Sequence, residues 1–185
     1  MSRSILRSWL MGCLLALLPG IALARGIVLE ADSHATDEAL VVSARAGIAL
    51  DADVIDALDN GITLQFVLEG RVSRSRRYWL DKPLVETRRV FALERHALSN
   101  RYSVVETGST RAQTFGNVAE ALAALGDFPE VLRVDKGKLE AGAAYIARVR
   151  LKLDTDELPS PMRPLVWISP AWWISSGWHE WTLLQ

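Results

Sequence analysis

Cysteine and histidine are scarce in this 185-residue chain, which contains one cysteine and three histidines. Cys13 lies in an apolar N-terminal run, so the rest of the chain can form neither a disulfide nor a cysteine-based metal or redox site. His34, His96 and His179 show no HxH, HxxxH or HExxH spacing, so a zinc or iron site would need three distant segments to meet. The sequence therefore predicts no metal, no cofactor and a fold held by its hydrophobic core.

Motifs of the common catalytic and nucleotide-binding folds are absent as well. The chain has no GxSxG, GxxxxGK[ST] or GxGxxG segment. The serines at 175–176 lack the strand-turn-helix setting of a serine nucleophile. The acids of 51–59 are spaced as on a solvated helix face, and they lack the twelve-residue loop of a calcium site. We therefore predict no catalytic residues and no enzyme.

Residues 1–24 have the pattern of a secretory signal peptide. Arg3 and Arg7 form a positive n-region, an apolar h-region follows, and Ala22-Leu23-Ala24 is an A-x-A cleavage site. A retained N-terminal membrane anchor is the alternative. Pro19-Gly20 and the short run disfavour it, because about 20 apolar residues are needed to span a bilayer. The prediction is export to the periplasm with a cleaved signal peptide.

Residues 25–185 have the length of one domain. Without Arg3 and Arg7 they carry 19 Lys and Arg against 22 Asp and Glu, a formal charge of 19 − 22 = −3. Such a balance gives no whole-molecule attraction to nucleic acid or anionic lipid. We therefore predict one exported domain with no nucleic-acid partner.

Apolar alternation indicates a β-rich fold. Ile62, Leu64, Phe66 and Leu68 share one face of a strand, and Gly70 marks a bend in one long curved strand. Its antiparallel return covers 84–95, and because neither face of that return is purely apolar, the hairpin is expected to extend beyond the core. Further strands are predicted at 26–32, 39–50, 101–106, 111–115, 143–153 and 178–184, and short helices at 51–60 and 117–125. The fold class is mainly β, an antiparallel β-sandwich or curved sheet with one or two short helices.

Arginine gathers in the predicted hairpin, with Arg71, Arg74, Arg76 and Arg77 on one side and Arg88, Arg89, Arg95 and Arg101 on the other. Guanidinium groups clamp phosphates or carboxylates and stack on aromatic rings. Arg74, Arg76, Arg77 and Trp79 are therefore candidate binding residues. The alternative, which we favour, is a ladder of cross-strand ion pairs with Glu69, Glu86, Glu94 and Glu106.

Five of the seven tryptophans lie in residues 167–185. Three prolines within 157–164 predict a stiff, extended connector ahead of them. Pro170 and several polar residues rule out a transmembrane helix here. We favour a plug that closes the core and ends in the last strand, because buried indoles supply large apolar area. There are two alternatives: the tryptophans anchor a protein partner, or they contact a membrane interface. Trp172 and Trp173 are the candidate binding residues for both.

These features together resemble the domain-of-unknown-function family 4390 of exported proteobacterial proteins. The resemblance rests on Arg77-Tyr78-Trp79-Leu80-Asp81, Leu98-Ser99-Asn100-Arg101-Tyr102, Leu158-Pro159, the signal peptide and the tryptophan-rich end. It covers nearly all of the mature chain and carries no catalytic residues. It implies a Gram-negative cell-envelope setting, with genes of membrane sensor kinases nearby.

The function predicted from these observations is a non-enzymatic periplasmic binding or accessory module, associated with a membrane sensor system. Its partner would be an envelope component or a membrane protein, met through the arginine ribbon and the aromatic end. Two alternatives stay open. One is an envelope hydrolase assembled from dispersed acids and histidines, and the other is a hydrophobic-ligand carrier with a lined cavity.

Overall fold

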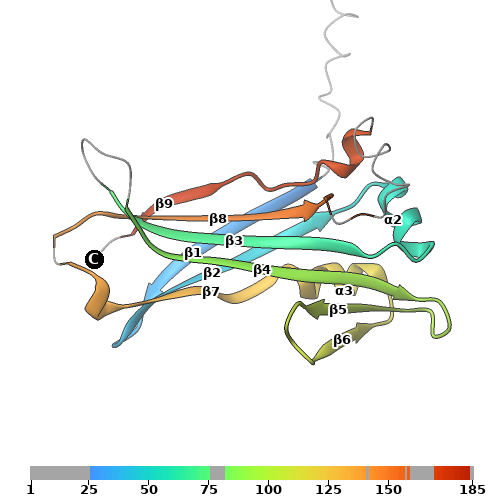
Figure 1. Cartoon of the computed structure of the whole chain (residues 1–185), viewed down its shortest axis with the longest axis horizontal. Coiled ribbons are helices and arrows are strands. Elements are labelled where there is room, and N and C mark those ends of the chain that lie inside the picture. Colours follow the sequence, from blue (N-terminus) through green and yellow to red (C-terminus); the bar gives the residue numbers. More distant parts are fainter. Residues whose placement is uncertain (1–25, 76–81, 141, 157, 159–168, 184–185) are drawn as a thin grey trace, which may run out of the picture.

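The computed structural model describes residues 26–75, 82–140, 142–156, 158 and 169–183. These residues form two antiparallel sheets (Figure 1). The small sheet has the order β1-β2-β7, with β1 at Gly26–Ala35, β2 at Ala39–Ala49 and β7 at Asp127–Asp135. The large sheet has the order β6-β5-β4-β3-β8-β9, with β6 at Ala112–Phe115, β5 at Arg101–Glu106, β4 at Lys82–His96, β3 at Leu64–Arg74, β8 at Tyr145–Asp154 and β9 at His179–Leu183.

The two sheets stack face to face, with β7 against β3 and β4 and with β1 against β8 and β9. The alternation along β3 places Phe66 and Leu68 in the interface, where both are fully buried. Gly70 lets the layers approach closely, since a Cβ there would lie 2.9 Å from Val131 Cγ1 and 3.0 Å from Leu132 Cδ2. The predicted mainly β, sandwich-like fold is confirmed.

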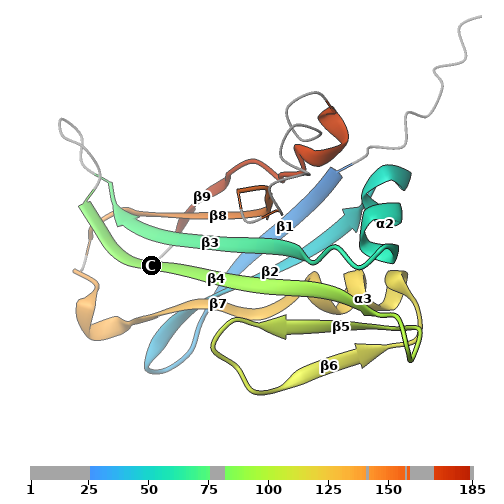
Figure 2. The same ribbon diagram turned by 45° about the vertical axis from the view of Figure 1, so that its right-hand side comes forward.

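Both predicted helices are present, as α2 at Ala52–Asp59 and α3 at Val118–Leu125. The Asn117 side chain caps α3 by accepting a hydrogen bond from the Glu120 backbone N–H at 2.9 Å. The next residue after α3, Gly126, is its C-cap, as the sequence predicts. Helix α3 contacts β2 of the small sheet and β5 of the large sheet (Figure 2). Within the described ranges, no helix is long and apolar enough to cross a membrane.

The expectation that the arginine-rich hairpin extends beyond the core is wrong for its described part, because β3 and β4 are the central strands of the large sheet. The inner face of β4 combines Phe91 and Leu93 with Arg89, and the charge of Arg89 is matched by Glu106. Because its arginine is ion-paired, β4 can lie in the centre of the large sheet although its inner face carries a charged residue among apolar ones. The hairpin tip was predicted at 81–83, but Lys82 and Pro83 begin β4 and pair with Arg74 and Ser73 of β3; residue 81 lies outside the described residues.

β7 is missing from the predicted strands. Pro129 and the adjacent apolar pair Val131-Leu132 break its alternation. The strand also pairs irregularly, with a register shift between Val42 and Ala44 of β2. It is an edge strand, where a proline costs no ladder hydrogen bond on the open side.

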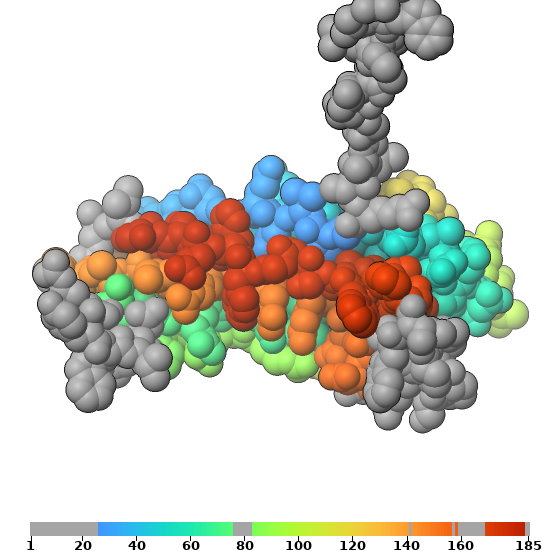
Figure 3. Space-filling view, turned by 90° about the horizontal axis from the view of Figure 1, so that it is seen from above, coloured from blue at the N-terminus to red at the C-terminus, as the bar shows by residue number. Residues whose placement is uncertain are grey.

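The tryptophan segment closes the sandwich only in part. Trp172 is buried, and Trp181 of β9 donates its indole N–H to Ser33 Oγ of β1 at 3.1 Å. Trp173 and Trp178 are 67% and 45% exposed, so the plug prediction does not hold for them. Figure 3 shows the C-terminal segment as a red band between blue β1 and orange β8. Apart from the buried Leu158, the predicted connector contributes only residues outside the described ranges.

Candidate functional site

The arginine ribbon is largely neutralised by acids. Arg71 Nε lies 2.8 Å from Glu86 Oε1, and Arg89 pairs with Glu106, as the ladder prediction requires. The other two acids of the predicted ladder differ: Glu69 pairs with Arg150 of β8, and Glu94 accepts a hydrogen bond from Thr63 Oγ1 at 3.3 Å. Cross-strand ion pairing of the arginines is therefore confirmed, although not every predicted pair forms. The pairing also includes β8, which the sequence did not place beside β3.

The residues proposed from the sequence as binding residues do not form one surface. Arg74 ends β3 and pairs with Glu140 at 2.6 Å. Trp172 and Trp173 adjoin α2, at the end of the molecule where β3 begins, about 30 Å away along the strand. Arg76, Arg77 and Trp79 lie outside the described residues.

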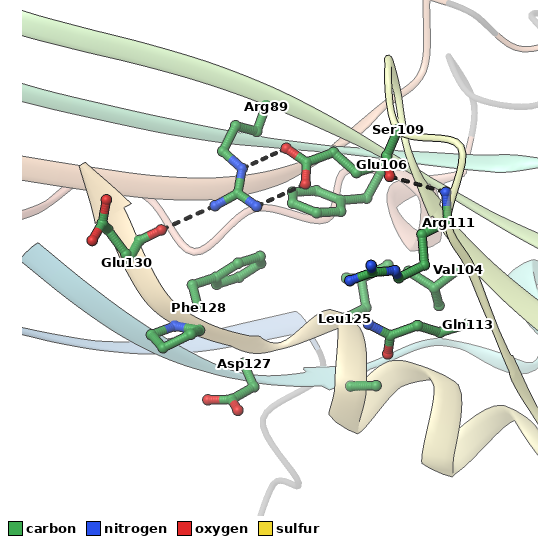
Figure 4. A pocket seen from close by; sticks show the side chains of 13 residues that line it. Arg89, Val104, Glu106, Ser109, Arg111, Gln113, Leu125, Asp127, Phe128 and Glu130 are labelled. Atoms are coloured by element: carbon green, nitrogen blue, oxygen red, sulfur yellow. Dashed lines mark hydrogen bonds and ion pairs between the residues drawn. The ribbon is translucent and has the colours of Figure 1, made fainter. Parts of the chain in front are cut away.

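A different site is formed where the two sheets differ in width. The small sheet has three strands and the large sheet six, so β7 covers β4 but does not reach β5 and β6. Helix α3 covers the inner face of β5 and β6 instead. Between β7, α3 and the β5-β6 hairpin remains a pocket of about 430 Å³, which we call the inter-sheet pocket (Figure 4).

The α3-to-β7 turn determines one wall of this pocket. Gly126 is buried, and its carbonyl accepts a hydrogen bond from the Ala46 backbone N–H at 2.7 Å. A Cβ at Gly126 would lie 2.0 Å from Ala46 O, so only glycine permits this approach of α3 to β2. The turn places Leu125 and Phe128 on the pocket wall.

The pocket has an aromatic floor. The rings of Phe91 and Phe128 lie 5.4 Å apart between centroids, tilted by 52°, and both residues are buried. Arg89 places its guanidinium carbon 5.1 Å from the Phe91 ring centroid. One side of the pocket is therefore apolar and closed by an oriented cation.

Arg89 is held by three hydrogen bonds. Its Nε and Nη2 donate to the two carboxylate oxygens of Glu106, at 2.6 and 2.8 Å, and its Nη1 donates to the Glu130 carbonyl at 3.0 Å. The hydrogen bond from Arg89 lowers the pKa of the Glu106 carboxyl from its ordinary value and raises the pKa of the Arg89 guanidinium. Both groups are thus charged at neutral pH, and they act as a rigid wall.

The opposite wall carries Arg111 and Gln113, from the segment that enters β6. Their spacing of two residues directs both side chains to the inner face, where Gln113 is paired with Val104. Figure 4 shows the Arg111 side chain extending into the pocket toward Phe128. Among the described residues, no acid forms an ion pair with Arg111, whose backbone N–H is held by Ser109 Oγ at 3.1 Å.

Sequence reasoning missed this pocket because its residues come from four strands and a helix, and β7 was not expected. The alternation along β4 does place Arg89 and Phe91 on one face, which is the only local signal. The three histidines lie on three strands, β1, β4 and β9. In the part of the chain that the structure describes, no group of three His, Cys, Asp or Glu residues could hold a metal ion.

The model of a family described as a domain of unknown function (DUF4390) matches residues 25–182, nearly the whole chain after the predicted signal peptide. No curated protein and no solved structure matches the chain.

Proposed function

The chain belongs to the DUF4390 family, and we propose that it is a non-enzymatic binding or accessory module that binds an envelope component in its inter-sheet pocket. The proposed location is the Gram-negative periplasm, reached by secretion with cleavage of the signal peptide after Ala24. The N-terminal sequence pattern supports this location. An accessory role beside a membrane sensor system is part of the proposal, on the strength of the family resemblance.

The observation that carries the proposal is the composition of the inter-sheet pocket. Ligand sites are concave, mostly apolar and of about 300–1,000 Å³, with a few convergent polar groups. The pocket has about 430 Å³, the Phe91-Phe128 floor, and polar groups of Arg89, Arg111 and Gln113 around it. Its accessible lining is more polar than apolar, so it matches this description by its volume, its aromatic floor and its convergent polar groups.

The charges of the pocket favour binding over catalysis. A general acid or base works best with a pKa near the operating pH. The hydrogen bonds of Arg89 move the pKa of Glu106 in the other direction, to below its ordinary value. Glu106 is thus suited to orienting Arg89 and poorly suited to exchanging protons at neutral pH.

A second candidate function, hydrophobic-ligand carriage, is favoured by an apolar groove beside the small sheet. The groove has about 720 Å³ and lies between the β1-β2 pair and the two helices. Val28 is 58% exposed within it. Its apolar lining consists mainly of Val28, Ile48, Leu50, Ile55, Val118 and Leu122.

A fragment screen by NMR on the isotope-labelled exported protein separates the two candidates. Fragments bound in the inter-sheet pocket shift the backbone amides of Phe91, Gln113 and Phe128. Fragments bound in the groove shift those of Val28 and Ile48. We expect most hits at the pocket. Hits confined to the groove would favour carriage, and no localised hits at either place would refute both.

A further inference from the structure

We propose that the ligand of the inter-sheet pocket is a small organic monoanion, a carboxylate attached to a flat apolar body. This inference rests on the proposed function, because it names the ligand class of the same pocket. Arg111 would bind the carboxylate, and Phe128 would contact the apolar body.

The first step is the charge balance of the lining. Three acids line the pocket, and each has its own arginine: Glu106 with Arg89 at 2.6 Å, Asp127 with Arg45 at 3.7 Å, and Glu130 with Arg133 at 3.0 Å. Arg111 is the lining charge that these pairs leave uncompensated among the described residues. Arg45 and Arg133 pair with two of these acids from outside the lining. Counted with them, four arginines face three acids, and Arg111 carries the one positive charge in excess, which favours an anion.

The second step is the geometry of the anion-binding wall. A guanidinium presents paired N–H donors that match a carboxylate in a bidentate hydrogen-bonded pair. Arg111 is exposed in the free protein, so a ligand carboxylate can reach it without breaking an existing ion pair. The amide of Gln113, two residues along on the same face, can donate a further hydrogen bond.

The third step concerns the number of negative charges on the ligand. Glu106, Asp127 and Glu130 stay in the lining even though each is paired. Each of these acids is balanced by its own arginine, so Arg111 compensates one further negative charge. A dianion such as a phosphate monoester would bring a second charge into the pocket with no cation left to pair with it among the described lining residues. The balance therefore favours a carboxylate over a phosphate.

The fourth step is the body of the ligand. Phe128 and Phe91 offer a tilted aromatic pair, and Leu125 and Pro129 extend the apolar lining beside them. Rings pack against such surfaces in offset or edge-to-face geometry. With about 430 Å³ of space, the pocket suits a ring system that bridges the aromatic floor and Arg111.

The test compares three probes of one shape: a naphthoate, the neutral naphthylmethanol and the cationic naphthylmethylammonium. Titrations of the exported protein are followed by calorimetry and by NMR shifts of Phe91, Gln113 and Phe128. We expect the naphthoate to bind about tenfold more tightly than the alcohol, and the ammonium more weakly than either.

Two arginine variants locate the effect. Arg111→Gln should reduce naphthoate affinity about tenfold and leave the alcohol unchanged. Arg101→Gln is the matched control, because Arg101 is an exposed arginine of β5 that does not line the pocket. Its naphthoate affinity should equal that of the unaltered protein. Circular dichroism confirms that both variants fold.

Two results would overturn the inference, and they differ from each other. Equal affinity for naphthoate and alcohol, or an unchanged naphthoate affinity in Arg111→Gln, would refute the anion assignment and leave the pocket as a binding site. Failure of all three probes to shift the pocket residues would refute the anion assignment and count against the proposed function itself.

Discussion

Replacing Gly126 by alanine should destabilise the fold through a steric clash between α3 and β2. The added Cβ would lie 2.0 Å from Ala46 O and 3.1 Å from Ala46 C, and these are backbone atoms that no rotamer change can move. The Gly126 φ of −86° is ordinary for alanine, so backbone strain adds nothing. The helix end and the strand must therefore separate, at the cost of the 2.7 Å hydrogen bond between them.

The expected magnitude follows from three contributions. Overpacking of a buried site costs about 1–3 kcal/mol, and the lost hydrogen bond costs about 1 kcal/mol. Alanine restricts the unfolded chain and returns about 0.4–1 kcal/mol. The net loss is about 2 kcal/mol, which lowers Tm by roughly 4–8 °C for a domain of this length.

Thermal and urea unfolding, followed by circular dichroism, measure this loss. Gly47→Ala is the matched control, since Gly47 is adjacent to Ala46 and the closest atom to its added Cβ, Val28 O, lies 4.0 Å away. We expect the control to change stability by less than about 0.5 kcal/mol or to raise it slightly, because glycine weakens a strand interior. A Gly126→Ala protein as stable as this control would refute the assigned close approach.

Two further predictions concern burial and pH. Trp172→Ala should cost about 3–5 kcal/mol of unfolding free energy because Trp172 is buried, whereas Trp173→Ala should change it by less than about 0.5 kcal/mol, as urea unfolding can measure. Similar losses for both would contradict the closing role of Trp172. Arg89 holds the folded-state pKa of Glu106 below its unfolded value near 4.5, so the stabilisation is present above that pH and is lost as the pH falls through the folded pKa. Glu106→Gln should therefore show a shallower loss of stability than the unaltered protein between neutral pH and pH values well below 4.5, and identical slopes would exclude this contribution.

Most of the local structure was predictable from the sequence. The Asn117 cap and the Gly126 stop define α3 without reference to the rest of the molecule. The alternation from Ile62 to Leu68 indicates which face of β3 packs into the hydrophobic core, although Val67 on the opposite face is buried as well. These signals act over a few residues, so a single sequence shows them. It was also predictable that the hairpin arginines pair with acids, because both residue types occur on its strands, but the individual partners were not.

The binding site was not predictable in the same way. Phe128 lies in β7, whose proline and adjacent apolar residues hide a strand, and Arg111 lies in an unremarkable polar segment. Their approach depends on how far the small sheet extends across the large one. The exposure of Trp173 beside the buried Trp172 likewise depends on what packs against each, which neighbouring residue types do not reveal.

The sequence by itself determined most of the secondary structure, with β7 as the exception, together with the scarcity of metal-binding residues and the candidate arginine and tryptophan clusters. The tertiary structure alone decided that the large sheet has six strands and the small sheet three, and that the space between them is lined by Phe91, Phe128 and Arg111. The physical reason is the sequence separation of the residues that determine each feature. Caps, turns and alternation are set by neighbours within a few residues, whereas the pocket results from contacts between strands and a helix far apart in the chain.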